Sequence, residues 1–251
     1  MTKFLLLSFV LTYCTSLKAQ VEKIDTDRPD QTESVYTTPK NYFQAEFGFS
    51  KENLFDRNYD LVSPTMLLKY GLKKTELRLE ASYISSYEHL IPNPKWIKGF
   101  DPISIGFKTQ LWEEKKLLPK TSFLFHVGLP TIASKVFRAD HLAPSFRFAM
   151  QNSLNRNIGL GYNIGAEWDG FSPTPAWLYT LTTGFNLGEK WYAYTEVFGF
   201  IQNNEKPQHN LDGGFGYYIS NDVKIDLSGG FGISQAAPKS YIATGISFRF
   251  K

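Results

Sequence analysis

The sequence is poor in cysteine and carries almost no excess charge, and these shortages exclude several classes of protein. Cys14 is the single cysteine among 251 residues, which excludes a framework of disulfide bonds. The 27 basic and 24 acidic side chains leave a net charge of +3, so a strongly basic nucleic-acid-binding protein is excluded. The 42% of hydrophobic and 20% of charged residues are typical of one folded domain and not of a disordered chain.

Long hydrophobic runs and local catalytic motifs are also missing. Beyond the leader described next, no segment approaches the roughly 18 consecutive apolar residues of a transmembrane helix. The chain has no Gly-x-Ser-x-Gly elbow, no His-Glu-x-x-His pair, no Walker loop and no dinucleotide fingerprint. Asp25, Asp27 and Asp30 are too loosely spaced for a calcium loop. We therefore expect neither an enzyme nor a bound cofactor or metal.

The first 19 residues have the features of a secretory signal peptide. Lys3 supplies the positive charge, residues 4–11 form a short apolar stretch, and Ala19 precedes the expected cleavage site. Cleavage is favoured over lipid attachment at Cys14, because Tyr13 is bulky where a lipidation site has a small residue. The chain is therefore expected to be exported. Its mature form would contain no cysteine and must be stabilised by something other than cross-links.

Aromatic residues and period-two alternation are abundant. Aromatic side chains make up 16% of the chain, beside 19 glycines. Residues 241–250 alternate apolar with small or polar side chains, and residues 42–50 do the same, which places the two sets on opposite faces of a β-sheet. Ten further segments of this kind begin near Leu61, Glu76, Ile103, Thr121, Pro144, Ile158, Ala176, Trp191, Leu211 and Val223.

The connections between the twelve expected strands alternate between two length classes. The shorter set comprises residues 71–75, 113–120, 153–157, 188–190 and 220–222, and the longer set 51–60, 88–102, 131–143, 169–175, 202–210 and 234–239. An even number of strands of about ten residues, with short turns at one end and long loops at the other, is typical of an outer-membrane barrel. The sequence therefore predicts an all-β, 12-stranded antiparallel up-and-down transmembrane β-barrel, with both termini at the periplasmic, short-turn end.

A secreted soluble barrel or sandwich would show the same alternation with its apolar face turned inward. A closed sheet of twelve strands, however, encloses more space than one apolar layer fills, because side chains fill barrels of about eight strands. The apolar face is therefore expected to meet lipid. An aromatic girdle at the strand ends would then be drawn from Tyr42, Tyr70, Tyr87, Trp112, Trp168, Trp177, Trp191 and Tyr241.

Charged side chains at inward positions of the strands form the candidate site. Isolated charges inside a barrel are costly, so they must pair or be hydrated. Two interpretations stay open: a structural network that bridges opposite walls, and a narrow charge-lined path for small solutes with little ion preference. The candidates are Glu46, Lys69, Arg78, Glu80, Lys108, His126, Arg147, Glu167, Glu196, Asp212, Asp226 and Arg249, together with Lys224.

Residues 20–40 precede the first strand and are rich in charges and turn formers. Such a segment is either a flexible tail or a small periplasmic plug that folds into the mouth of the barrel. The expected organisation is a signal peptide over residues 1–19, a periplasmic N-terminal segment over 20–40, and the barrel over 41–251. The motif of the N-terminal segment is Asp27, Arg28, Pro29, Asp30 and Gln31.

This motif is part of a wider resemblance to a known family. Residues 26–34, followed by residues 42–46, resemble the opening of the outer-membrane family labelled "putative meta-pathway of phenol degradation". Further similarity lies in residues 68–72, 76–80, 129–130, 212–214, 226–228 and 245–250. Lys69 stands where the family usually has arginine, which keeps the charge but loses a bidentate fork. The resemblance implies an outer-membrane barrel that transports small molecules, and it fixes no substrate.

The expected function is passive diffusion of small polar or aromatic solutes through a charge-lined lumen, in the outer membrane of a diderm bacterium. One alternative is a non-conducting barrel that is structural or binds at its surface. Another is an outer-membrane lipid hydrolase whose serine and histidine come from different strands. Expected partners are outer-membrane lipid, the solute and the barrel-insertion machinery, which would recognise a terminal strand ending in Phe248 and Phe250. No nucleic acid is expected, and the sequence leaves the oligomeric state open.

Overall fold

The computed structural model describes residues 22–89 and 92–251, so the expected signal peptide over residues 1–19 lies outside the described residues. The described chain is mostly β-strand, with two 3-10 helices, η1 (Pro130–Ile132) and η2 (Lys135–Phe137). Within it, no helix is both long and apolar enough to cross a bilayer. The strands are β1 (Phe43–Asn53), β2 (Tyr59–Gly71), β3 (Thr75–Glu88), β4 (Lys95–Phe100), β5 (Ile103–Trp112), β6 (Lys120–Leu129), β7 (Ala143–Ser153), β8 (Ile158–Glu167), β9 (Ala176–Leu187), β10 (Trp191–Gln202), β11 (Gln208–Ser220), β12 (Val223–Gly232) and β13 (Ser240–Phe250).

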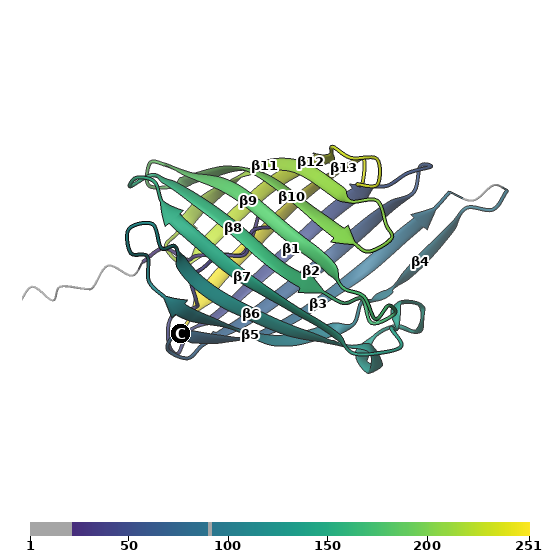
Figure 1. The fold of residues 1–251 in the computed structure, drawn as a ribbon, viewed down its shortest axis with the longest axis horizontal. Helices are drawn as coiled ribbons and strands as arrows, with labels where there is room; N and C mark the ends of the chain where they lie inside the picture. Colours follow the sequence, from purple (N-terminus) through teal and green to yellow (C-terminus); the bar gives the residue numbers. More distant parts are fainter. Residues whose placement is uncertain (1–21, 90–91) are drawn as a thin grey trace, which may run out of the picture.

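These strands form one closed antiparallel wall (Figure 1). Strands pair with their neighbours along the chain, and β1 closes the ring on β13, with Phe43 opposite Phe250. β4 and β5 both pair with β3, β4 along residues 83–88 and β5 along residues 75–80, so these two strands share one position in the wall. The wall therefore has twelve positions, which confirms the prediction of a 12-stranded antiparallel barrel.

β4 lies where the sequence predicts a loop over residues 88–102, so that prediction is wrong over the strand. Its pairing with β3 carries two aromatic contacts. The rings of Tyr87 and Trp96 lie 5.2 Å apart between centroids, and those of Tyr83 and Phe100 meet edge to face at 5.1 Å. These cross-strand contacts stabilise a hairpin that continues past the rest of the wall at the long-loop end (Figure 1).

The strand positions and the two ends of the barrel follow the expected pattern. Each expected strand start lies within three residues of the observed one, and the largest difference is between Leu211 and Gln208. The chain ends at the short-turn end of the barrel (Figure 1). The described chain also begins there, because the Arg249 guanidinium donates a hydrogen bond to the carbonyl of Glu22.

The two faces of the wall differ sharply in polarity. The buried apolar cluster in the described residues is small and consists of Val35, Leu124 and Ala149. Large apolar side chains instead stay exposed on the outward face, as a lipid-facing surface requires. They include Phe43, Leu68, Leu77, Ile105, Ile164, Trp177, Leu181, Phe215, Leu227 and Ile246. The inward face buries carboxylates, ammonium groups and guanidinium groups, so the interior of this barrel is polar.

Candidate functional site

Residues 22–42, which we call the lumen segment, run inside the barrel before β1 begins (Figure 1). The segment enters at the short-turn end, where the amide of Ile24 donates to the carbonyl of Asn221. It returns to the same end, where the amide of Asn41 donates to the carbonyl of Gly71. Between these two points it forms hydrogen bonds with inward-facing groups on many strands of the wall, as the following contacts show.

Asp27 is the centre of a buried charge cluster formed with β2, β3 and β5. Its Oδ2 atom accepts hydrogen bonds from Lys69 Nζ at 2.8 Å and from Arg78 Nη1 at 3.0 Å. Its Oδ1 atom accepts from Lys108 Nζ at 2.7 Å and from the amide of Ser34 at 3.0 Å. Burial by itself would raise the pKa of Asp27, but the three cations hold that pKa well below its usual range. The carboxylate is therefore ionised and fully coordinated.

Glu46 on β1 binds the main chain of the same part of the lumen segment. Its Oε2 atom accepts from the amides of Asp27 at 3.1 Å and Arg28 at 3.2 Å. Its Oε1 atom lies 2.5 Å from Lys69 Nζ and accepts from Gln44 Nε2 at 3.0 Å. A wall carboxylate thus neutralises a wall ammonium and also satisfies two buried amides, which a purely apolar wall would leave unpaired.

Arg28 lies against β1 and β13, where two glycines leave room for its side chain, and it reaches an acidic residue on β12. Its guanidinium pairs with Asp226 on β12, with Nη2 2.9 Å from Oδ1 and Nε 3.3 Å from Oδ2. Gly48 and Gly245 stand opposite each other on β1 and β13. A Cβ atom on Gly48 would lie 2.2 Å from Arg28 Nη1, and one on Gly245 would lie 2.3 Å from Arg28 Nε. The absence of side chains at this pair is therefore what admits the guanidinium.

On the far wall, Glu196 of β10 binds the lumen segment through neutral donors. Its Oε2 atom accepts from the amide of Gln31 at 2.7 Å, and its Oε1 atom accepts from the hydroxyl of Thr32. The Thr32 hydroxyl also bonds to that of Thr180 on β9 at 2.6 Å. The amide of Glu33 follows with a bond to Asn163 Oδ1 on β8 at 2.7 Å.

Asp212 on β11 is held by two tyrosines beside this contact. Its Oδ2 atom accepts from the hydroxyl of Tyr194 at 3.2 Å and from the hydroxyl of Tyr241. Tyr194 also lies within hydrogen-bond distance of the carbonyl of Pro29, at 3.3 Å. Tyr241 therefore points into the lumen, and its assignment to an outward aromatic girdle is wrong. The cause is parity, because Tyr241 shares the inward face of β13 with Arg249.

The returning half of the lumen segment is bound mainly through its backbone. The carbonyl of Val35 accepts from Ser122 Oγ on β6 at 2.6 Å, and the amide of Thr38 donates to Glu76 Oε2 on β3 at 2.6 Å. Lys108 Nζ also donates to the carbonyl of Ser34 at 2.9 Å. These contacts complete a set that involves strands on all sides of the barrel.

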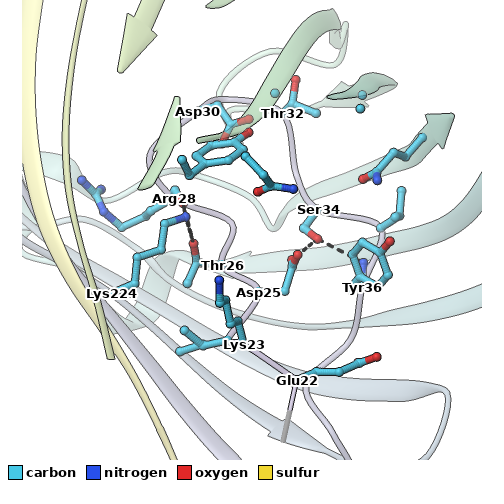
Figure 2. A pocket seen from close by; sticks show the side chains of 18 of the residues that line it. Glu22, Lys23, Asp25, Thr26, Arg28, Asp30, Thr32, Ser34, Tyr36 and Lys224 are labelled. Atoms are coloured by element: carbon cyan, nitrogen blue, oxygen red, sulfur yellow. Dashed lines mark hydrogen bonds between the residues drawn. The ribbon is translucent and has the colours of Figure 1, made fainter. Parts of the chain in front are cut away.

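Two cavities border the lumen segment. The larger, about 650 Å³, opens at the short-turn end between the segment and the wall (Figure 2). Asp30, Lys224 and Tyr192 are among its lining residues, and Lys224 Nζ donates to Thr26 Oγ1 at 2.8 Å. Burial raises the pKa of Asp30 to about 7, against the opposing effect of Lys224. The smaller cavity, about 230 Å³, lies on the other side of Arg28, where Glu80 and other residues line it.

Four of the expected lumen residues form two side-chain contacts nearer the long-loop end, with His126 buried and Glu80, Arg147 and Glu167 partly exposed. His126 Nε2 lies 3.3 Å from Glu80 Oε1, and Arg147 Nη2 lies 3.5 Å from Glu167 Oε2. Arg147 Nη1 also reaches the carbonyl of Gln31 at 3.4 Å. The side chains of Glu80, Arg147 and Glu167 have more solvent around them than those of the Asp27 cluster.

The structure brings some of the expected charged residues together and keeps others apart. Lys69, Arg78 and Lys108 converge on Asp27, whereas Glu196 and Asp212 lie on the opposite wall. Arg249 instead pairs with Asp222 near the short-turn end, 2.7 Å away. Several participants escaped sequence reasoning: Gln44, Glu76, Ser122, Asn163, Thr180 and Tyr194. Of these, Glu76 lies two residues before Arg78 on β3, so the alternation of the strand predicts that its side chain also faces inward.

The described residues contain no group of three or more histidine, cysteine or acidic side chains placed to hold a metal ion. His126 lies at an inward position of β6, where a hydrolase could use it, and Glu80 is its partner in the wall at 3.3 Å. Among the described contacts, its imidazole has no hydrogen bond with a serine hydroxyl, so the geometry gives no support to a serine nucleophile at this position.

Comparisons with known proteins agree on the fold. The family described as "Putative MetA-pathway of phenol degradation" matches residues 26–250. An outer membrane channel from Pseudomonas putida F1 is similar at 8% identity, over 91% of this chain and 100% of that one, with a TM-score of 0.67. The KdgM porin in complex with disordered oligogalacturonate is similar at 8% identity, over 83% and 99% of the two chains, with a TM-score of 0.57. The NanC porin gives 9% identity, 82% and 98% coverage, and a TM-score of 0.54. A search of the curated proteins gave no match.

Proposed function

We propose a function from the premise that this chain belongs to the family described as "Putative MetA-pathway of phenol degradation", as its sequence predicts. Together with the barrel fold and its apolar outward face, this membership places the protein in the outer membrane of a diderm bacterium. We propose that it is a passive channel for small solutes, and that the lumen segment is a plug that narrows its path.

The observation that carries this proposal is the polar interior. The inward face bears ionised side chains of both signs, and cavities of about 650 Å³ and 230 Å³ lie on the two sides of the lumen segment. A barrel with only a structural role has no need for such spaces, whereas a solute path needs them. Because the charges of the two signs lie close together, the path is expected to discriminate little between anions and cations.

The lumen segment is proposed as the narrowest part of this path. It lies between the two cavities and is bound at Asp27, Arg28, Gln31 and Thr38 to strands on different sides of the barrel. Solutes that pass must therefore be small, or the segment must move. We propose small polar or aromatic molecules as solutes. The oligogalacturonate bound by the KdgM porin is consistent with a polar solute in a barrel of related fold.

Single-channel conductance of the full mature protein tests the proposal. Deletion of residues 21–34 removes every bond to Asp27, Arg28, Gln31 and Thr32, so we expect conductance to rise several-fold. Unchanged conductance would count against a plug. Liposome swelling with sugars and with small aromatic acids then tests the solutes. Conductance that stays at background level even after the deletion would favour the alternative, a non-conducting structural or surface-binding barrel.

A further inference from the structure

The outward face of the barrel is almost free of charge, with two exceptions, one on β1 and one on β4, which are separated in the wall by β2 and β3. The pairing registers place Lys51 of β1 opposite Leu61 and Ile242, and Lys98 of β4 opposite Ser85, all on the outward face. Along the strands of the described chain, every other outward position is apolar, small or uncharged polar, apart from the histidine at position 209. Both lysines lie toward the long-loop end of the barrel, which is the extracellular end.

The two lysines rest on one aromatic platform. Lys51 Nζ lies 4.6 Å from the centre of the Tyr59 ring, and Lys98 Nζ lies 4.9 Å from that of Trp96. The Tyr59 and Trp96 rings meet edge to face at 5.6 Å, and Tyr87 contacts both, at 5.0 and 5.2 Å. Cation–π contacts position the ammonium groups beside rings that favour the interface between lipid and water.

No carboxylate neutralises these two ammonium groups within the described residues. The nearby acids Glu52 and Asp60 face inward, because Glu52 pairs with Tyr241 and Asp60 with Ser86. Glu88 also faces inward and pairs with Lys95 at 3.0 Å. The outward surface here is therefore locally cationic, and an ammonium at a lipid interface needs an anion or water as its partner.

From this arrangement we infer that Lys51 and Lys98, on the platform of Tyr59, Tyr87 and Trp96, bind the phosphate groups of lipopolysaccharide in the outer leaflet. The charge is complementary, the position is the extracellular end of the lipid-facing surface, and a lysine binds phosphate as a point charge. This inference requires residence in the outer membrane, and it holds whether or not the barrel conducts.

Native mass spectrometry of the full mature protein in detergent, titrated with bisphosphorylated lipid A, tests the inference. Substitution of both lysines, K51Q with K98Q, keeps the side-chain lengths similar and removes both charges. We expect its affinity for lipid A to fall about tenfold. The matched control, K115Q with K116Q, removes the same charge from the turn between β5 and β6 at the opposite end and is expected to leave the affinity unchanged.

Two further arms keep the test decisive if the double variant folds poorly. Lysine-to-arginine substitution at both positions retains the charge and is expected to retain binding. The unmodified protein is expected to bind lipid A that phosphatase has freed of phosphate about tenfold more weakly than the phosphorylated form. Equal affinity for the two lipids would overturn the inference, and so would equal affinity for phosphatidylglycerol, which would indicate a general preference for anionic lipid.

Discussion

Two regions of the barrel wall hold the lumen segment by opposite chemistry. On β2, β3 and β5, the segment supplies the anion, and Lys69, Arg78 and Lys108 supply three cations within 3.0 Å of Asp27. On β10, the wall instead supplies the acceptor, and Glu196 accepts hydrogen bonds from an amide and a hydroxyl of the segment. The first contact is a buried ion cluster, whereas the second consists of hydrogen bonds from neutral donors.

The difference shows which contact determines the position of the segment. Asp27 contacts all three buried cations within 3.0 Å, whereas Glu76 and Glu33 contact Arg78 and Lys108 at 3.1–3.9 Å. A carboxylate that accepts neutral donors depends on them less, because water can replace those donors at lower cost. We therefore expect the Asp27 cluster to dominate the docking free energy, and Glu196 to contribute less.

The largest effect is expected from Asp27→Asn, which tests whether the Asp27 cluster dominates the docking free energy of the lumen segment. The substitution leaves three buried cations with one fewer anion, so it should weaken docking by about 3–5 kcal/mol. Hydrogen exchange of the amides in residues 22–42 measures the change, because several of these amides donate to wall carboxylates. We expect these amides to lose their protection and the conductance to rise.

Asp25→Asn is the matched control for this substitution. It makes the same chemical change two residues away, where the carboxylate accepts a hydrogen bond from the Ser34 hydroxyl and contacts none of the three cations. Protection should therefore remain close to that of the unmodified protein. Equal losses in the two variants would show that the Asp27 cluster has no special part in docking.

A smaller effect is expected from Gly48→Ala, which tests the fit of Arg28. The new Cβ would lie 2.2 Å from Arg28 Nη1 and 2.5 Å from Thr65 Oγ1, so the guanidinium must move away from Asp226. We expect docking to weaken by about 1–3 kcal/mol, as overpacking usually costs. Gly159→Ala is the control, because its nearest neighbour, Gln151 Nε2, is 3.5 Å from the added atom. Hydrogen exchange should separate the two variants.

The role of Gly48 illustrates how far the sequence alone reaches. Alternation and loop lengths predict the barrel, its strand count and its strand starts. This is possible because successive residues of each strand face lipid and lumen in turn, so that apolar and polar side chains alternate in the sequence. The same parity places Lys69, Arg78 and Lys108 inside. It cannot say that these three meet at one carboxylate, because that depends on the path of a segment with no regular structure.

The misjudged elements have equally specific causes. β4 has its own alternation, but its strand pairing depends on aromatic partners on β3 that lie outside the predicted loop. Tyr241 was assigned by residue type to an interface, although its parity with Arg249 points inward. Thr32 and Asn163 carry no charge, so the pattern of ionised residues does not identify them. Thr32 of the segment nevertheless donates to Glu196 of the wall, and Asn163 of the wall accepts from the amide of Glu33.

Glu196→Gln is expected to have a smaller effect and sharpens the comparison of the two walls. The amide oxygen still accepts one of the two hydrogen bonds made to Glu196, so the loss should be about 1 kcal/mol. Hydrogen exchange of the Gln31 amide, which donates to this carboxylate, gives the most local readout. A loss as large as that of Asp27→Asn would contradict the expected dominance of the ion cluster.

The smallest effect is expected from pH, and its sign differs between two groups of acids within the lumen segment. Burial raises the pKa values of Asp30 and Glu33 to about 7, so their contribution to docking is complete below their ordinary pKa values and is lost as pH rises through 7. The pKa of Asp27 is lowered, so its contribution is lost only in strong acid.

Docking should therefore weaken modestly between pH 6 and pH 8, by less than about 1 kcal/mol because Asp30 and Glu33 border the open cavity. Conductance recorded at both values measures this change, and Asp30→Asn should reduce the difference. A difference of the opposite sign would contradict the assignment of the response to Asp30 and Glu33.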